Sequence, residues 1–244
     1  RRFPVCREMY SDRYTPVEVM RILRKESRHC YLLESAGQTE QWGRYSFLGY
    51  DPSMEITCTD GKMRIRKTSL GGWSEEELRT VDHPGQVLRE IIDENRTPEL
   101  PGIPTFTGVR SAGLEQSYEK AEAKLNEIEK LLKTGEKMEF PPIQLKTEIE
   151  PQFSEEKYEK MVEKAKYYIR EGDIFQVVLS NPMRAKTEGS LFDTYRVLRT
   201  HNPSPYMFYF SSDDIEIAGA SPETLVKLEG RKVSTFPLAG TRPR

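Results

Sequence analysis

The last residues of the chain have side chains that suit the binding of an anion. They read PLAGTRPR, residues 237–244. Gly240 lets a backbone N–H approach a ligand closely, and Thr241 adds a hydroxyl donor. Arg242 or Arg244 could hold a carboxylate through two parallel hydrogen bonds. This stretch is therefore a candidate site for a carboxylic acid.

A second candidate is the carboxylate of Glu223 in ASPETL, residues 220–225. The triplet Ser221-Pro222-Glu223 resembles a helix start, where Glu223 would only complement the helix dipole. The residues that follow read as a hairpin strand instead of an amphipathic helix. Glu223 would then lie on a proline-stiffened corner, a suitable place for a positioned acid or base.

Two further stretches suit an amino-acid ligand with an apolar side chain. In LLES, two leucines precede Glu34 and Ser35, which could receive an ammonium group. In NPSPYMFYF, residues 202–210, two prolines restrict the loop before Tyr206 and Met207, which would form an apolar wall. The alternatives are a strand running into a turn and a loop entering a core strand, and the residues alone leave both open.

Composition excludes several classes of protein. The 37 basic and 39 acidic residues nearly balance, unlike the basic footprint of a nucleic-acid binder. No apolar run approaches the roughly 18 residues of a membrane helix, and residues 1–10, which are polar after two arginines, are not expected to be a signal peptide. The three cysteines and three histidines are scattered, which favours a reducing, cytoplasmic location and no zinc site. No dinucleotide or ATP motif occurs.

These candidate residues must be positioned by helices and antiparallel strands. Thr15 is the predicted cap of a first helix, and Asp60-Gly61 predicts a hairpin. Residues 71–80 read as a polar loop or short helix, and 140–151 as an extended connector. The other predicted helices are 84–96, 117–133, 154–170 and 191–202, and the other predicted strands include 29–35, 173–180, 205–210 and 215–220.

Two of these expectations concern the core. The run DIFQVVLS, residues 173–180, is typical of a buried strand. The apolar stripe from Tyr158 to Ile169 predicts a helix face that packs against a core. Because the strands follow one another through tight turns, the sheet is expected to be antiparallel with helices laid against it. That is an α+β fold.

Taken together, the four stretches resemble component I of anthranilate synthase, a chorismate-utilising enzyme. The resemblance is carried by LLES and RYSFLGYDP within residues 32–52, and by GDIFQVVLS, NPSPYMF, ASPETLVKL and PLAGTRP within residues 172–243. It implies an incomplete α+β fold of sandwich-like antiparallel sheets flanked by helices. Such enzymes are lyases of tryptophan biosynthesis that convert chorismate and ammonia to anthranilate and pyruvate. They require Mg²⁺, receive ammonia from a glutamine amidotransferase subunit, component II, and are feedback-inhibited by L-tryptophan.

The resemblance also assigns roles to residues of this chain. Gly240 and Thr241 would contact chorismate, and Glu223 and Thr241 are the candidate catalytic residues. The magnesium ligands would lie beyond Arg244, so no metal ligand is expected here. The expected tryptophan pocket comprises Glu34, Ser35, Arg44, Asn202, Pro205, Tyr206 and Met207.

The resemblance further implies that the chain is part of a longer enzyme and is inactive alone. The family continues well past Arg244, a segment is expected to be missing at Gly108–Val109, and the first residue is Arg instead of Met. The implied division is an N-terminal regulatory subdomain (1–108), a helix and connector (109–150) and the first part of the chorismate-binding catalytic domain (151–244).

Alternative functions remain at this point. Aminodeoxychorismate synthase carries a lysine nucleophile in a P-I-K-G-T motif, whereas this chain has Ala239, which has no nucleophilic atom. Isochorismate or salicylate synthase is a second chorismate-using alternative. In a different class, the chain would be a tryptophan-binding regulatory module only.

Overall fold

A computed structural model describes residues 5–35, 45–69, 72–96, 114–229 and 231–236. The chain divides into two compact units, and each unit is built from two pieces of sequence. Residues 1–31 and 48–138 form the first unit, and residues 32–47 and 139–244 form the second. The functional division expected at 108 and 150 stays a prediction.

The first unit contains three helices and a three-stranded antiparallel sheet of order β3-β4-β5. Its elements are α1 (Pro16–Glu26), β3 (Met54–Thr59), β4 (Lys62–Ser69), β5 (Gly72–Thr80), α2 (Pro84–Glu94) and α3 (Leu114–Thr134).

The predicted first helix and first hairpin are confirmed. Thr15 Oγ1 accepts the N–H of Glu18 at 3.2 Å, and the Glu18 carboxylate in turn accepts the backbone N–H of Thr15, which completes a capping box, and also binds Lys137. Asp60 and Gly61 have φ of 49° and 75°, as a tight two-residue turn between β3 and β4 requires.

Strand β5 corrects the expectation of a polar loop or short helix over residues 71–80. Its glutamates have low strand propensity, but two of the three lie opposite cations of β4. Glu75 is paired with Lys67 and Glu76 with Arg66 in the β4–β5 register. Opposite charges across an antiparallel pair stabilise the sheet, which accounts for a strand made of polar residues.

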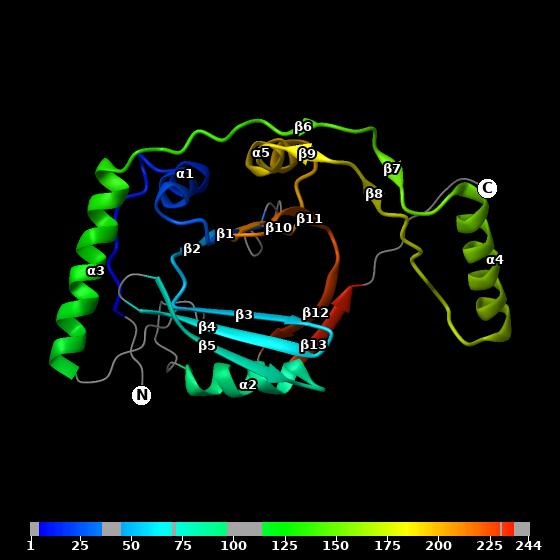
Figure 1. Ribbon diagram of the computed structural model, residues 1–244, viewed down its shortest axis with the longest axis horizontal. Helices are drawn as coiled ribbons and strands as arrows, with labels where there is room; N and C mark the ends of the chain where they lie inside the picture. Colours follow the sequence, from blue (N-terminus) through cyan, green and yellow to red (C-terminus); the bar gives the residue numbers. More distant parts are fainter. Residues whose placement is uncertain (1–4, 36–44, 70–71, 97–113, 230, 237–244) are drawn as a thin grey trace. The chain divides into compact units, whose positions relative to one another are not determined.

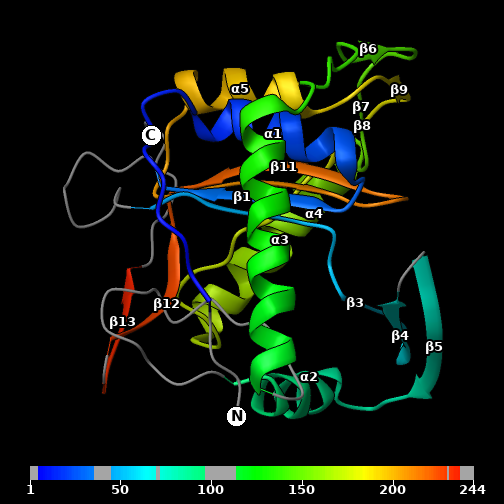
Figure 2. The same ribbon diagram turned by 90° about the vertical axis from the view of Figure 1, so that its left-hand side faces the viewer.

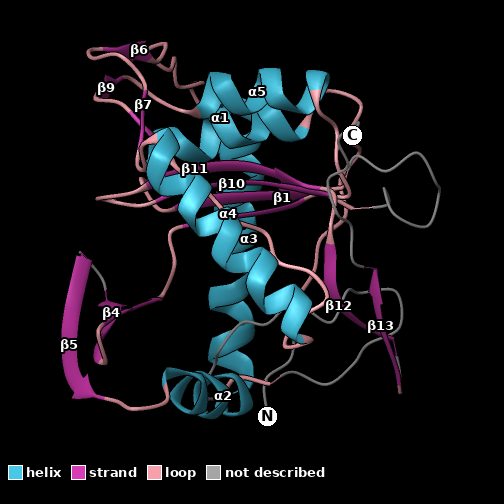
Figure 3. Ribbon diagram, turned by 90° about the vertical axis from the view of Figure 1, so that its right-hand side faces the viewer, coloured by secondary structure: helices cyan, strands magenta, loops and turns pink. Residues whose placement is uncertain are grey.

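Among the described residues, the second unit has two helices, two short strand pairs and two longer antiparallel strand pairs. Its elements are β6 (Gln144–Leu145), β7 (Glu150–Pro151), α4 (Glu155–Glu171), β8 (Met183–Arg184), β9 (Thr187–Glu188), α5 (Phe192–His201), β10 (Tyr206–Ser211), β11 (Glu216–Ser221), β12 (Thr224–Glu229) and β13 (Lys232–Phe236). Figure 3 shows β12 and β13 as an antiparallel pair separate from β10 and β11.

Strands β10 and β11 belong to a four-stranded sheet. Its order is β11-β10-β1-β2, where β1 is Cys30–Glu34 and β2 is Phe47–Tyr50. Helix α5 lies along one face of β10 and β11 (Figures 1 and 2). Antiparallel strand pairs, together with helices of which α5 packs on β10 and β11, confirm the expected α+β class.

The core under α5 is aromatic. Phe192 stacks on Phe140 with ring centroids 4.4 Å apart and meets Tyr209 edge-on at 5.0 Å. In β10 the side chains alternate, so that Met207, Tyr209 and Ser211 are buried. This alternation decides which β10 side chains face the helix.

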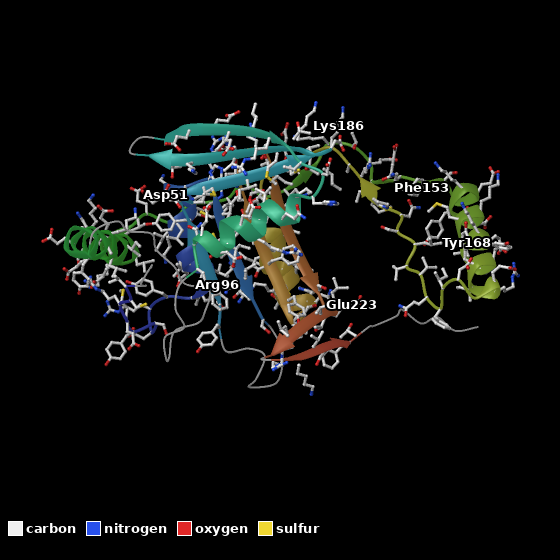
Figure 4. All side chains as sticks on the ribbon, turned by 90° about the horizontal axis from the view of Figure 1, so that it is seen from below. Asp51, Arg96, Phe153, Tyr168, Lys186 and Glu223 are labelled. Carbon is white, nitrogen blue, oxygen red and sulfur yellow. The ribbon has the colours of Figure 1, made fainter. Side chains whose placement is uncertain are left out.

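Two expectations about buried surfaces are wrong. Residues 173–180 form no strand, and Phe175 and Val178 are 97% and 77% exposed, because no strand in the described parts of the chain pairs with them. Helix α4 begins and ends as predicted, with Ser154 as cap and Gly172 at φ 82°. Its apolar face is not buried, however, and Tyr168, labelled in Figure 4, is 38% exposed.

Among the described helices, none combines the length and the apolar character that crossing a membrane requires.

Candidate functional site

The side chain of Glu34, at the end of β1, lies in a buried polar cluster of the second unit. Its Oε2 accepts the hydroxyl of Tyr195 at 2.6 Å and lies 2.7 Å from Arg199 Nε. Its Oε1 accepts Arg199 Nη2 at 2.8 Å and Ser46 Oγ at 3.4 Å. The carboxylate and guanidinium therefore form a two-point ion pair, with the Glu34 side chain only 5% exposed.

Helix α5 supplies both main donors of this cluster. Tyr195 and Arg199 are four residues apart, so they lie on the same face of the helix. Burial, with the hydrogen bond to Glu34 as the next cause, raises the pKa of the Tyr195 phenol well above its usual value of about 10. At physiological pH the Tyr195 phenol is therefore neutral and donates its hydrogen to the Glu34 carboxylate.

Ser35, the next residue, differs from Glu34 because its hydroxyl forms no hydrogen bond in the described structure. Its Oγ is buried and has no hydrogen-bond partner in the described structure, a property shared only by Arg24 Nε and Ser211 Oγ among the described side chains. Leaving such a group unsatisfied costs about 1–3 kcal/mol. The Glu34 carboxylate has no free acceptor position, whereas the hydroxyl of Ser35 can still form a hydrogen bond. A polar group of a ligand could therefore bind at Ser35.

The NPSPYM stretch connects α5 to β10. Asn202 ends the helix, where its N–H donates to Leu198 O at 2.9 Å. Pro205 is half-buried just before the strand. Tyr206 is 37% exposed and its hydroxyl lies 2.9 Å from Thr224 Oγ1, whereas Met207 is 2% exposed.

Tyr206 and Met207 therefore occupy opposite faces of β10, since consecutive strand residues alternate. Met207 shares the buried face with Tyr209, on the side where α5 packs. Tyr206 and Met207 were expected to form one apolar wall, but their side chains point to different faces of β10.

A second carboxylate, the half-buried Glu216 on β11, anchors the other end of α5. It accepts the hydroxyl of Ser190 at 2.6 Å, the N–H of Leu191 at 3.0 Å and the hydroxyl of Tyr209. Ser190 Oγ in turn accepts the N–H of Phe192. Helix α5 is therefore tied to the sheet by one carboxylate near each end.

The expected chorismate site is only partly described. Glu223 is exposed between β11 and β12, where its N–H donates to Ser221 Oγ at 3.4 Å (Figure 4). Gly240 and Thr241, together with Arg44 of the expected tryptophan pocket, lie outside the described residues, as do Ala239 and the Gly108–Val109 junction. No three His, Cys, Asp or Glu side chains of the described residues gather as metal ligands.

Sequence reasoning missed Tyr195 and Arg199. A signal was present in YRVLR, where a tyrosine and an arginine are spaced four apart on a predicted helix. Nothing in the sequence indicated that their acceptor is Glu34, 161 and 165 positions away.

Comparison with known families decides what kind of protein carries these features. The family described as chorismate binding enzyme matches residues 105–244, more than half of the chain. The chain belongs to this family. The resemblance read from LLES and PLAGTRP is thereby supported by a match that includes the second of these motifs.

The similar curated proteins carry the name anthranilate synthase component 1. The one from Acetivibrio thermocellus is 30% identical over 302 residues, which cover 99% of this chain and 60% of the relative. The one from Aquifex aeolicus is 30% identical, with 99% and 59% covered. The one from Methanothermobacter thermautotrophicus is 32% identical, with 94% and 55% covered. The chain thus spans less than two thirds of the length of these relatives.

Among solved structures, anthranilate synthase component I from Streptococcus pneumoniae is similar. The sequence identity is 22% and the TM-score is 0.39, with 92% of this chain and 47% of that chain covered.

Proposed function

We propose that this chain belongs to the large subunit of an anthranilate synthase of tryptophan biosynthesis. The proposed reaction converts chorismate and ammonia to anthranilate and pyruvate, with the ammonia supplied from glutamine by a partner amidotransferase. The proposal is supported by the chorismate-binding family match and by relatives of that name that align with nearly all of the chain.

In the proposed reaction, ammonia adds to the chorismate ring as the ring hydroxyl leaves as water. Elimination of pyruvate then makes the ring aromatic. Gly240 and Thr241 would hold a substrate carboxylate, and Glu223 would serve as an acid or base near the ring. Magnesium belongs to the proposal as a Lewis acid at that carboxylate. Because the described residues contain no cluster of ligands for it, we assign it to none of them.

The same proposal includes feedback inhibition by L-tryptophan at the end of β1. The observation that carries this part is the buried, unpartnered Oγ of Ser35 beside the fully used carboxylate of Glu34. Asn202, Pro205 and Tyr206 would form the remainder of the pocket, with Arg44 at its rim, and Met207, whose side chain faces the other side of β10, would contribute its backbone. If tryptophan and chorismate oppose each other by a typical coupling of about 1–3 kcal/mol, each must weaken the other by the same factor.

Product analysis tests the catalytic part. The full-length enzyme, supplied with chorismate, Mg²⁺ and ammonium, is expected to release anthranilate and pyruvate in equal amounts. Ala239 disfavours aminodeoxychorismate synthase, because its methyl group cannot act as a nucleophile. Formation of isochorismate, salicylate or aminodeoxychorismate without anthranilate would overturn the assignment.

Calorimetry with L-tryptophan tests the regulatory part. The chain is expected to bind L-tryptophan, and Ser35→Ala is expected to weaken binding at least tenfold. Ser53→Ala, which removes a hydroxyl from an exposed serine of the first unit, is the matched control and should bind like the wild type. Equal binding by the Ser35 and Ser53 variants would refute the proposed pocket.

A further inference from the structure

We propose that Tyr195 and Arg199 are positioning residues for the tryptophan site, which they act on by holding Glu34 at the end of β1. The inference rests on the proposed function, because it takes the ligand at Ser35 to be L-tryptophan. It assigns to helix α5 a role in that site that neither the family match nor the relatives specify.

The Glu34 carboxylate already has a hydrogen-bond donor at each of its acceptor positions. An ionised carboxylate offers about four acceptor positions. Tyr195 takes one, Arg199 takes two through its Nε and Nη2, and Ser46 approaches Oε1 at 3.4 Å. A ligand's ammonium group would have to displace one of these donors. Glu34 therefore contributes to the site indirectly, and Ser35 contributes the open polar atom.

The cluster of Glu34, Tyr195 and Arg199 joins the two segments expected to form the pocket. On one side, Glu34 is followed directly by Ser35. On the other, Arg199 lies two residues before the end of α5, and Asn202 opens the NPSPYM stretch. One ion pair between residues 165 positions apart thus ties the end of β1 to the helix that leads into the second segment.

The ion pair between Glu34 and Arg199 gives this connection a fixed geometry. A buried ion pair often contributes no more to stability than apolar side chains of the same size would. Its directional bonds do fix the two partners in one relative arrangement. Holding Glu34 in one position fixes the backbone at Ser35, so that the buried Oγ faces the ligand without a search through other conformations.

The Glu216 cluster provides an internal control. There too a buried tyrosine, Tyr209, donates its hydroxyl to a carboxylate that anchors α5. Glu216, however, is not next to any residue of the expected pocket. Removing the hydroxyl of Tyr209 therefore loosens the same helix without releasing the end of β1.

The experiment measures L-tryptophan affinity by calorimetry at a temperature where circular dichroism shows every variant folded. Tyr195→Phe and Arg199→Lys are expected to weaken binding at least tenfold. The matched controls are Tyr209→Phe and Arg196→Lys, the latter on the exposed side of α5, where Arg196 pairs with Asp193. Both controls should stay within about twofold of the wild type.

A double-mutant cycle separates positioning from general support of the fold. In the wild-type background Ser35→Ala should weaken binding at least tenfold. In the Arg199→Lys background it should weaken binding less than threefold further, because Ser35 is no longer held in place. Fully additive effects, or unchanged affinity in Tyr195→Phe and Arg199→Lys, would overturn the positioning role while leaving the tryptophan site intact. No binding by the wild type would overturn the tryptophan site and this inference together.

Discussion

Helices α4 and α5 of the second unit are both amphipathic, yet only α5 buries its apolar side chains. Phe192 and Tyr195 of α5 are fully buried, whereas Tyr167 and Ile169 of α4 are 50% and 44% exposed. Both helix starts have side-chain acceptors, since Ser154 caps α4 and Ser190 Oγ accepts the N–H of Phe192 at the start of α5. Capping determines where a helix begins, but the burial of its apolar face depends on partners elsewhere in the chain.

The largest expected difference between the two helices is the cost of truncating an aromatic side chain. Phe192→Ala removes a ring packed between Phe140 and Tyr209 and should lower the free energy of unfolding by about 3–5 kcal/mol. Tyr167→Ala, on the exposed face of α4, should cost less than about 1 kcal/mol. Urea unfolding followed by circular dichroism measures both, and equal losses would contradict the contrast drawn between α4 and α5.

The next effect is the loss of a buried hydrogen bond on α5. Tyr195→Phe should lower the free energy of unfolding by about 1–3 kcal/mol, because Glu34 then loses a buried donor. Tyr168→Phe, on α4, is the control and should be neutral. A neutral Tyr195→Phe would show that Glu34 is sufficiently held by Arg199 and Ser46 alone.

The raised pKa of Tyr195 adds a pH dependence of known sign. Since its folded-state pKa lies above the unfolded value of about 10, the neutral form stabilises the fold fully below that pH. This contribution should be lost as the pH rises past about 10, toward the higher folded-state pKa. Stability measured from pH 8 to pH 11 should therefore fall more steeply in the wild type than in Tyr195→Phe. Equal slopes of stability against pH in the wild type and in Tyr195→Phe would contradict the raised pKa of Tyr195.

A smaller effect is expected at the end of α4. Gly172 has φ of 82°, so Gly172→Ala should cost about 1 kcal/mol through backbone strain alone, with no atom near the added methyl group. Because α4 buries no side chain, the loss should appear as faster amide exchange in the last turn of α4. Amides of α5 should exchange as before, and a joint change in both helices would show that α4 and α5 unfold together.

The smallest effect is expected for the surface ion pairs of α4. Glu156 and Lys160 approach to 2.6 Å, but their side chains are 78% and 74% exposed. Water and salt screen such a pair, so Glu156→Gln should not shift the urea midpoint measurably. A clear loss of stability would show that α4 is packed against other parts of the protein in solution.

The same contrast explains how far the sequence predicts this structure. Thr15 and Asp60-Gly61 act within a few residues of their own position, and the helix start and hairpin that they predict are confirmed. The helix predicted over 154–170 is confirmed as well, with Ser154 and Gly172 as its caps. The predicted strand at 173–180 and the buried face of α4 are wrong, because both require a partner that hydrophobic patterning cannot supply. Strand β5 was missed for a related reason, since its glutamates are stabilised by cations on β4.

The residues of the candidate site also differ in whether the sequence alone can reveal them. Glu34, Ser35 and the NPSPYM stretch stood out because unusual residue types lie side by side in the sequence. Tyr195 and Arg199 did not, because their importance depends on a carboxylate 161 and 165 positions away. Only the pairing of α5 with the end of β1 shows that Glu34 is held and that Ser35 is left open.

Hydrogen exchange with and without L-tryptophan tests the proposed tryptophan site most directly. Binding is predicted to slow exchange in the segments 32–35 and 202–211, with little change over strands β3 to β5 at 54–80. Slowed exchange confined to 54–80, or no change at saturating L-tryptophan in either segment, would contradict the proposal.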